Sequence, residues 1–340
     1  MTTTSPAPAG PSAPSRRAVA GAAGAVVRLG LPVLVLGVLL AEVGAAPFVR
    51  ALGLVTPEVL AAAVAITLAT TVLTAWRWTW VARRLGLRLG LRRAVAAYYR
   101  SQLLNQVLPG GVLGDVHRAV RHGGDELALG RAARAVAWER VAGQVGLLAV
   151  TLVVVPALPA AVGSGIGRAV APAVATLVGL SLVGLVLVAM LVGSVRERLR
   201  ETVVGRGGVA VRSDWQQLAS GAGPWPPLAA SVAAAAGYLA LLLLAARAAG
   251  VDLPARAMLP LLVVVLFASS LPVNLAGWGP REGAAAWVFA TAGLGAATGV
   301  TVATLYGVVS LAAATPGLVV LLADVGPRPI PATTDSLETP

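Results

Sequence analysis

The sequence contains no cysteine and no lysine, and charged residues make up only 12% of it. The absence of cysteine excludes disulfide bonds, thiolate metal sites and cysteine nucleophiles. Two histidines leave little material for a transition-metal site, so we expect neither a metal nor a cofactor. Because no lysine is available for a Walker A motif, the glycine-rich stretches are weak candidates for nucleotide phosphate loops. The low charge content also argues against a large soluble domain, since such domains average about 25% charged residues.

Hydrophobic residues account for 57% of the chain and occur in long continuous runs. Only helices or a closed barrel can span a bilayer, because every backbone polar group must be satisfied internally. Long apolar runs, rather than ten-residue segments of alternating hydrophobicity, indicate helices. The composition therefore predicts an all-α integral membrane protein.

The formal net charge of +12 comes entirely from arginine, and the sequence pI is about 11.6. A pI this high is also found in nucleic-acid-binding proteins. Here, however, the arginines fall between the apolar runs, as in the cytoplasmic loops of membrane proteins. Their charge favours anionic lipid headgroups. We therefore expect membrane lipids as partners and no nucleic acid.

The apolar runs predict six spans within one membrane domain, 28–325, whose halves are about 28–158 and 168–325. The flanking segments, 1–27 and 326–340, have the composition of disordered tails. The arginine distribution places both termini on the cytoplasmic side of the cell membrane. The six spans are expected at 29–49, 57–82, 132–158, 169–195, 225–249 and 298–323. Three tryptophans close to the end of the second span are interpreted as interface anchors: Trp76, Trp78 and Trp80.

Two further segments are interrupted by proline and glycine, which break helices: 91–131, which begins as an amphipathic helix and is too polar to cross the membrane after Pro109, and 257–294, which begins as an apolar run. The interrupting residues are Pro109, Gly110, Gly111 and Gly114 in the first segment, and Pro272, Gly277 and Gly279 in the second. We interpret the segments as re-entrant helical hairpins that enter from opposite sides. Paired broken helices in two halves are typical of an inverted repeat that surrounds a transport site. Eight full spans are the alternative topology.

Polar and ionisable residues gather at both breaks and in the span that follows the first one. They are Asn105, Asp115, His117, Arg118, Glu139 and Arg140, followed by Asn274, Arg281 and Glu282. Ionisable residues within a membrane are functional candidates by default. Arginine can bind a phosphate through two parallel hydrogen bonds, and a carboxylate can orient it or pair with a cationic headgroup.

Structural roles compete with this interpretation. Asp115 could cap a helix by accepting hydrogen bonds from free backbone amides. Glu139 and Arg140 could lie near the interface and reach toward the headgroups, although adjacent residues on a helix point in different directions. Arg281 and Glu282 could form an ion pair that closes a tight turn.

The residues at the first break also carry a family resemblance. They are Asn105, Leu108-Pro109, Gly110, Gly114-Asp115 and Arg118. This pattern resembles the Asn, Leu-Pro-Gly, Gly-Asp/Glu and Arg signature of the lysylphosphatidylglycerol synthase transmembrane-region family, whose members are flippase-like proteins. Glu139-Arg140 resembles the acidic-Arg pair of the family's next helix, and Leu305 to Leu318 resembles its final helix. The second break is similar to the family's second motif but departs from it at 274–276 and at Trp278.

The resemblance implies a function in lipid movement. Members of the family include the membrane half of bacterial phosphatidylglycerol lysyltransferases, which moves aminoacylated lipid between leaflets, whereas the transferase activity belongs to a separate soluble domain. We expect no synthase activity here, because the apolar spans leave no room for that domain. The leading hypothesis is a flippase-like protein that translocates or binds an anionic or polyprenyl-phosphate-type lipid.

In this hypothesis Arg118, Arg140 and Arg281 contact phosphate. Asp115, Glu139 and Glu282 order these arginines or bind a coupling proton. Two alternatives from other classes stay open: a membrane-embedded transferase acting on a lipid-linked substrate, and an accessory subunit of a separately encoded lipid-modifying enzyme. The sequence also leaves open whether the protein is a homo-oligomer.

Overall fold

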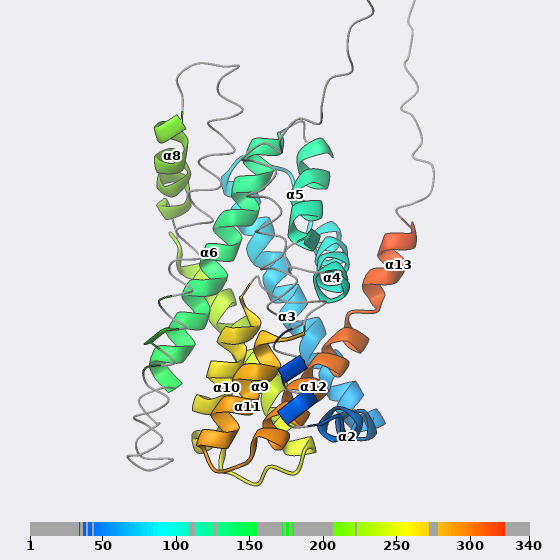
Figure 1. The fold of residues 1–340 in the computed structure, drawn as a ribbon. Coiled ribbons are helices and arrows are strands. Elements are labelled where there is room, and N and C mark those ends of the chain that lie inside the picture. Colours follow the sequence, from blue (N-terminus) through cyan, green and yellow to red (C-terminus); the bar gives the residue numbers. More distant parts are fainter. Residues whose placement is uncertain are drawn as a thin grey trace, which may run out of the picture.

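The computed structural model describes residues 44–108, 113–125, 128–154, 207–221, 223–271 and 278–323, with scattered helical positions within 34–42 and 172–179. The described elements are helical, which confirms the predicted helical membrane protein (Figure 1). Their bounds are α2 Ala46–Gly53, α3 Pro57–Arg84, α4 Leu91–Val107, α5 Leu113–Asp125, α6 Leu129–Val154, α8 Gly207–Ala219, α9 Trp225–Ala248, α10 Ala255–Ser269, α11 Pro280–Thr291, α12 Ala296–Ala313 and α13 Pro316–Ala323.

Four segments of the described chain are long and apolar enough to cross a membrane: α3, α6, α9 and the continuous stretch Ala296–Ala323. They coincide with four of the six predicted spans, to within a few residues at their ends. The predicted spans at 29–49 and 169–195 lie mostly outside the described residues. So do both predicted tails and five of the helix-breaking positions: Pro109, Gly110, Gly111, Pro272 and Gly277.

Local sequence explains where these helices begin. The hydroxyl of Thr56 accepts a hydrogen bond from the backbone amide of Val59 at 3.3 Å, and Pro57 occupies the first helical turn of α3. A threonine cap satisfies one free amide of the first turn, and proline is tolerated there because its missing donor would have no helical partner.

The first predicted span is wrong at its end, and the last is confirmed as a span but is divided into two helices. The prediction continues the first span to Val49, but Gly44 has φ 79 and a separate helix, α2, begins at Ala46. A left-handed glycine cannot continue a right-handed helix. The last was expected to be one helix, but α12 ends at Ala313 and α13 begins at Pro316, because proline lacks the amide needed to continue the backbone ladder.

The segment between the predicted spans at 169–195 and 225–249 contains an additional helix, α8. Asp214 of α8 is buried and pairs with Arg134 of α6, with 2.6 Å between Oδ2 and Nε. Leu218 joins a buried cluster formed by the end of α3 and the start of α6. The helix is therefore fixed to these two spans, which sequence polarity alone did not indicate.

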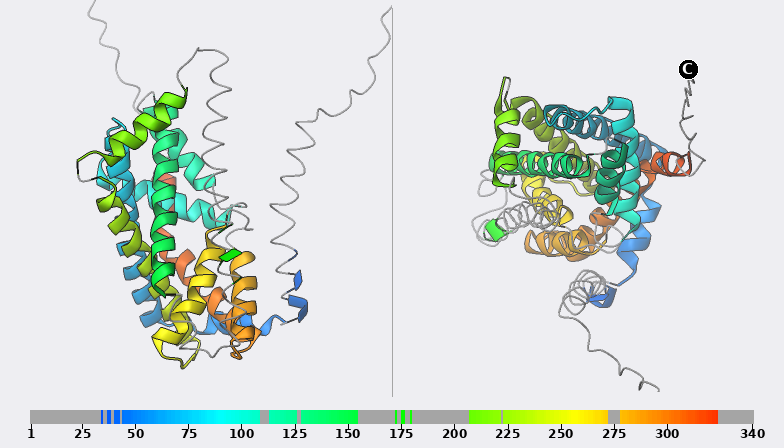
Figure 2. Two further views of the ribbon diagram at one scale, coloured as in Figure 1. Left: turned by 90° about the vertical axis from the view of Figure 1, so that its left-hand side faces the viewer. Right: turned by 90° about the horizontal axis from the view of Figure 1, so that it is seen from above.

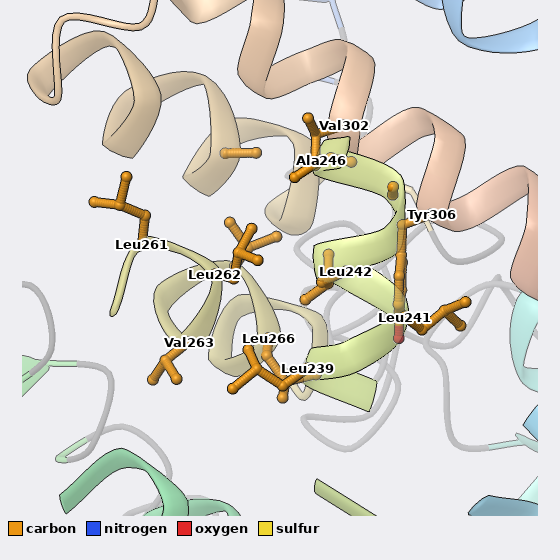
Figure 3. Close-up of a cluster of buried hydrophobic side chains, with 14 of the residues drawn as sticks. Leu239, Leu241, Leu242, Ala246, Leu261, Leu262, Val263, Leu266, Val302 and Tyr306 are labelled. Atoms are coloured by element: carbon orange, nitrogen blue, oxygen red, sulfur yellow. The ribbon is translucent and has the colours of Figure 1, made fainter. Parts of the chain in front are cut away.

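The largest buried cluster of the described residues joins α9, α10, α11 and α12, and Figure 3 shows part of it. Leu242 of α9 and Leu262 of α10 are fully buried in it, and Val302 of α12 packs beside them. Small residues bring the helices close together: Gly237 of α9 lies directly against the side chain of Thr70 on α3. Close packing through small residues is how helices associate where lipid offers no hydrophobic contrast.

The two interrupted segments occupy opposite ends of the molecule. Figures 1 and 2 show α4 and α5 toward the upper end and α10 and α11 toward the lower end, while α3, α6 and α9 run along its length. Elements of the two predicted halves interleave, since α3 packs against α9, α12 against α2, and α13 against α4.

Gly146 allows α6 to approach α9. A methyl group at this position would lie 2.5 to 2.6 Å from atoms of Ser231. We expect Gly146→Ala to lower stability by about 1–3 kcal/mol, because an overpacked contact must shift the backbone. Gly130→Ala is the matched control, since Gly130 is exposed on the same helix with only the Arg134 guanidinium nearby at 3.9 Å. Thermal unfolding in detergent measures both; equal melting temperatures would contradict the packing argument.

Candidate functional site

Five charged side chains from three helices form one continuous ion network: Arg77 of α3, Asp115 and Arg118 of α5, and Glu139 and Arg140 of α6. Glu139 lies at its centre. Its Oε1 accepts from Nε of Arg77 at 2.9 Å, and its Oε2 accepts from Nη2 of Arg118 at 3.0 Å. The same Nη2 donates to Oδ1 of Asp115 at 2.9 Å, and Arg140 donates to Oδ2 of Asp115. The network therefore links the helix after the first break to two predicted spans.

Burial differs sharply within the network. Arg118 and Glu139 are each 1% exposed, whereas the side chain of Arg140 is 50% exposed. Charges this deeply buried require partners, because removing an ion from water is costly. The structure therefore encloses Glu139 in the interior of the bundle, whereas its neighbour Arg140, on a different side of the helix, pairs with Asp115 and stays half-accessible.

Two side chains of helix α4 also donate hydrogen bonds to Asp115. The hydroxyl of Ser101 donates to Oδ1 of Asp115 at 3.2 Å, and Nδ2 of Asn105 donates to its Oδ2 at 3.3 Å. Oδ1 of Asn105 also accepts from the backbone amide of Gly114 at 2.8 Å. The described partners of Asp115 are thus side chains, whereas the helix-cap interpretation requires backbone amides. Asn105 performs the capping role at this turn instead.

Gly114 permits the close approach of α4 and α5. A Cβ atom there would lie within 2.8 Å of Asn105 Oδ1 and would overlap the carbonyl oxygen of Ser101. The glycine of the predicted break therefore lies within the first turn of α5 and supports the packing that positions Asp115.

Aromatic rings surround the guanidinium of Arg118. Its Cζ lies 4.4 Å from the ring centre of Trp78 and 4.2 Å from that of Tyr98. Among the described residues, Nε and Nη1 of Arg118 have no hydrogen-bond partner, so the ring faces stabilise this side of the cation. Trp78 is only 1% exposed, so its interpretation as an interface anchor is wrong.

Sequence reasoning missed Arg77 as a member of the site, because it treated the arginines as loop residues between the apolar runs. Arg77 is 6% exposed, and besides Glu139 it donates from Nη1 to the hydroxyl of Ser231 on α9 at 2.9 Å. Its guanidinium lies against Gly143 of α6. The available signal was its position inside the apolar run, seven residues before the end of α3.

The network lies inside one end of the bundle. Arg77 precedes the end of α3 by about 10 Å, and Glu139 follows the start of α6 by about 15 Å, at 1.5 Å per helical residue. The ends themselves carry exposed arginines: Arg83, Arg88, Arg92, Arg93 and Arg131. A hydrocarbon core is about 30 Å thick, so the ion network lies deeper than an interfacial arginine belt.

Arg281 and Glu282 form a second, separate ion pair at the start of α11. Nε of Arg281 donates to Oε1 of Glu282 at 2.9 Å, and the backbone amide of Gly279 donates to Oε2 at 2.8 Å. Gly279 has φ 117, a conformation that glycine adopts readily. Glu282 is fully buried, and both of its oxygens have local partners, as the structural interpretation of this pair expects.

The rings of Trp278 and Tyr306 flank the Arg281 guanidinium at 5.4 and 5.3 Å. Tyr306 belongs to the large buried cluster, and Tyr238 of α9 packs against that cluster.

The structure brings together five of the nine predicted site residues: Asn105, Asp115, Arg118, Glu139 and Arg140. Arg281 and Glu282 form their own pair, and His117 is half-buried on α5. Asn274 lies outside the described residues. Within the described part of the chain, no group of three or more His, Asp, Glu or Cys side chains could hold a metal ion.

These features define a polytopic helical membrane protein with a charged network buried beside a helix break. Comparison with known families identifies it further: the profile of the lysylphosphatidylglycerol synthase TM region matches residues 21–317. The chain therefore belongs to this family, as its motifs predicted. No curated protein and no solved structure matched the chain significantly.

Glu139 is the anion that neutralises two buried arginines. We expect Glu139→Gln to destabilise the fold by about 3–5 kcal/mol, because it leaves Arg77 and Arg118 buried without their shared counter-charge. Arg140→Gln, one residue further along α6 and half-exposed, should cost less than about 1 kcal/mol. Thermal or denaturant unfolding of the two variants is the measurement, and comparable losses would refute the central position of Glu139.

Proposed function

We propose that the protein binds an anionic lipid at the ion network and moves it between leaflets. The observation that carries the proposal is the combination of a deeply buried ion network with one half-exposed member, Arg140, beside a helix break. Broken helices at membrane depth are tolerated where they border protein or a water-filled cavity, and in transporters they form the substrate site.

Stability alone is a weak reason for such a network. Replacing a buried ion pair by apolar side chains of similar size is often neutral or stabilising. A network that joins Arg77, Arg118 and Glu139 across three helices and ends in the half-accessible Arg140 is better explained by a role in positioning an arginine for a charged ligand. Arginine suits a phosphate because its planar guanidinium offers two parallel donors.

Membership of the family supports a role in lipid handling but leaves the lipid and the direction of movement to experiment. The carboxylates that a transferase would use as a base, Asp115 and Glu282, are both paired with arginine in the structure. This pairing favours a binding protein over an enzyme.

The topology that we propose has two re-entrant hairpins, α4–α5 and α10–α11, in a cell-membrane protein with cytoplasmic termini. Their four helices contain 17, 13, 15 and 12 residues. These lengths correspond to about 18–26 Å, which is shorter than a hydrocarbon core of about 30 Å. Their positions at opposite ends of the molecule are those expected of an inverted pair (Figures 1 and 2).

Leaflet exchange of lipid tests the function directly. Liposomes containing the purified protein should move fluorescent phosphatidylglycerol to the outer leaflet faster than empty liposomes, as measured by dithionite quenching. Asp115→Asn should slow this exchange at least tenfold, because a neutral amide cannot balance Arg118 and Arg140. Asp252→Asn, at a fully exposed carboxylate outside the network, should leave the rate unchanged. Exchange no faster than in empty vesicles, with phosphatidylglycerol and polyprenyl-phosphate lipids alike, would end the proposal.

Single cysteines test the opposed hairpins, and the cysteine-free sequence requires no background removal. Cysteines at Gly111 and Arg92 should react with a membrane-impermeant maleimide only from the cytoplasmic side. Cysteines at Ala276 and Asp252 should react only from the other side. Arg92 and Asp252 are exposed and calibrate the two faces. Labelling of Gly111 and Ala276 variants from the same side would exclude the inverted arrangement.

A further inference from the structure

The ion network is unbalanced in charge. Three guanidinium groups, those of Arg77, Arg118 and Arg140, are joined to two carboxylates, those of Asp115 and Glu139. These five paired side chains therefore carry a net charge of +1. In the sequence, the residues that connect α4 to α5, Pro-Gly-Gly-Val at 109–112, carry no charge. Because buried charge is costly unless neutralised, one further anion would complete the network.

Only one member of the network is free to reach that anion. The side chain of Arg140 is 50% exposed, whereas Arg118 is enclosed by Trp78, Tyr98 and the two carboxylates. Arg77 is equally occupied, by Glu139 and Ser231. Arg118 and Arg77 are thus fixed parts of the fold, although the sequence had suggested Arg118 as a phosphate ligand.

Asp115 can release Arg140 without losing its own partners. Its Oδ1 would keep the hydrogen bonds from Ser101 and Arg118, and its Oδ2 would keep that from Asn105. Breaking the Arg140 contact therefore leaves no carboxylate oxygen unsatisfied. The geometry permits exchange at this one pair and opposes it elsewhere in the network.

We propose that Arg140 exchanges Asp115 for the phosphate of a phosphodiester that carries a single negative charge and no amine. This inference names the ligand class of the translocation site and rests on the proposed function. One negative charge balances the network, whereas a phosphomonoester dianion would exceed the balance. Within the described network an amine-bearing headgroup would find no free carboxylate, because Asp115 is 10% exposed at its side chain, Glu139 is 1% exposed, and arginine pairs with both.

The experiment measures lipid binding rather than movement. Protein in phosphatidylcholine nanodiscs is titrated with phosphatidylglycerol, with lysyl-phosphatidylglycerol or with phosphatidic acid, and bound lipid is counted by native mass spectrometry. Wild type should bind phosphatidylglycerol at least tenfold more tightly than either competitor. Arg140→Gln should abolish this preference, and Arg140→Lys should restore part of it, because lysine keeps the charge but loses the two-donor geometry. Arg131→Gln is the matched control, an exposed arginine on the same helix outside the network.

Soluble glycerophosphoglycerol distinguishes a lipid from a free diester. Failure of this compound to displace bound lipid at millimolar concentration assigns the site to lipid, and displacement assigns the same diester site to a soluble ligand.

Equal binding of all three lipids, or an unchanged preference in a folded Arg140→Gln protein, would overturn the inference. If lipid binding depends on Arg140 but no leaflet exchange is measured, the proposed translocation is wrong and the proposed ligand class stands. If leaflet exchange is measured but the protein shows no lipid preference, the proposed ligand class is wrong and the proposed translocation stands.

Discussion

A carboxylate buried inside an apolar helix bundle requires positively charged partners at defined positions around it. Glu139 is fixed by guanidinium groups from two other helices, Arg77 and Arg118, and these determine how α3, α5 and α6 are rotated about their axes. A rotation that removed either arginine would leave buried charge unpaired, at a cost of several kcal/mol. The network thus specifies one arrangement of the helices, and the aromatic rings of Trp78 and Tyr98 close it from the side.

Small residues make this arrangement sterically feasible. Gly114 lies against the backbone of α4, Gly143 against the Arg77 guanidinium, and Gly146 against Ser231. Each removes a side chain at the point where a polar group of a neighbouring helix approaches. These three glycines therefore permit both the polar contacts and the close packing between helices, as expected where helices associate without a hydrophobic driving force.

The two charged clusters divide their roles by geometry. The second ion pair, Arg281 with Glu282, is built from adjacent residues and closes the turn that begins α11. The ion network collects residues that are up to 63 positions apart, from Arg77 to Arg140, and ends in a half-exposed group. Local pairing suits a structural turn, and long-range pairing that ends in a half-exposed arginine suits the ligand site that we propose.

The sequence by itself determined the class of the protein and most of its helices. A membrane-spanning helix is recognised from the hydropathy of its own residues, without knowledge of its tertiary contacts. The bounds of α3, α6 and α9 were therefore predicted to within a few residues. The motif at the first break also indicated Asn105, Asp115 and Arg118 as candidate site residues, because a helix break and its polar residues lie close together in the sequence.

Tertiary structure decided which charges are buried and which stay accessible. The burial of Arg77 and Trp78, the docking of α8 and the different exposures of Arg118 and Arg140 all depend on how each helix is rotated toward its neighbours. That rotation is fixed by contacts between residues far apart in sequence, so the local sequence indicated only that Arg77 lies inside an apolar run.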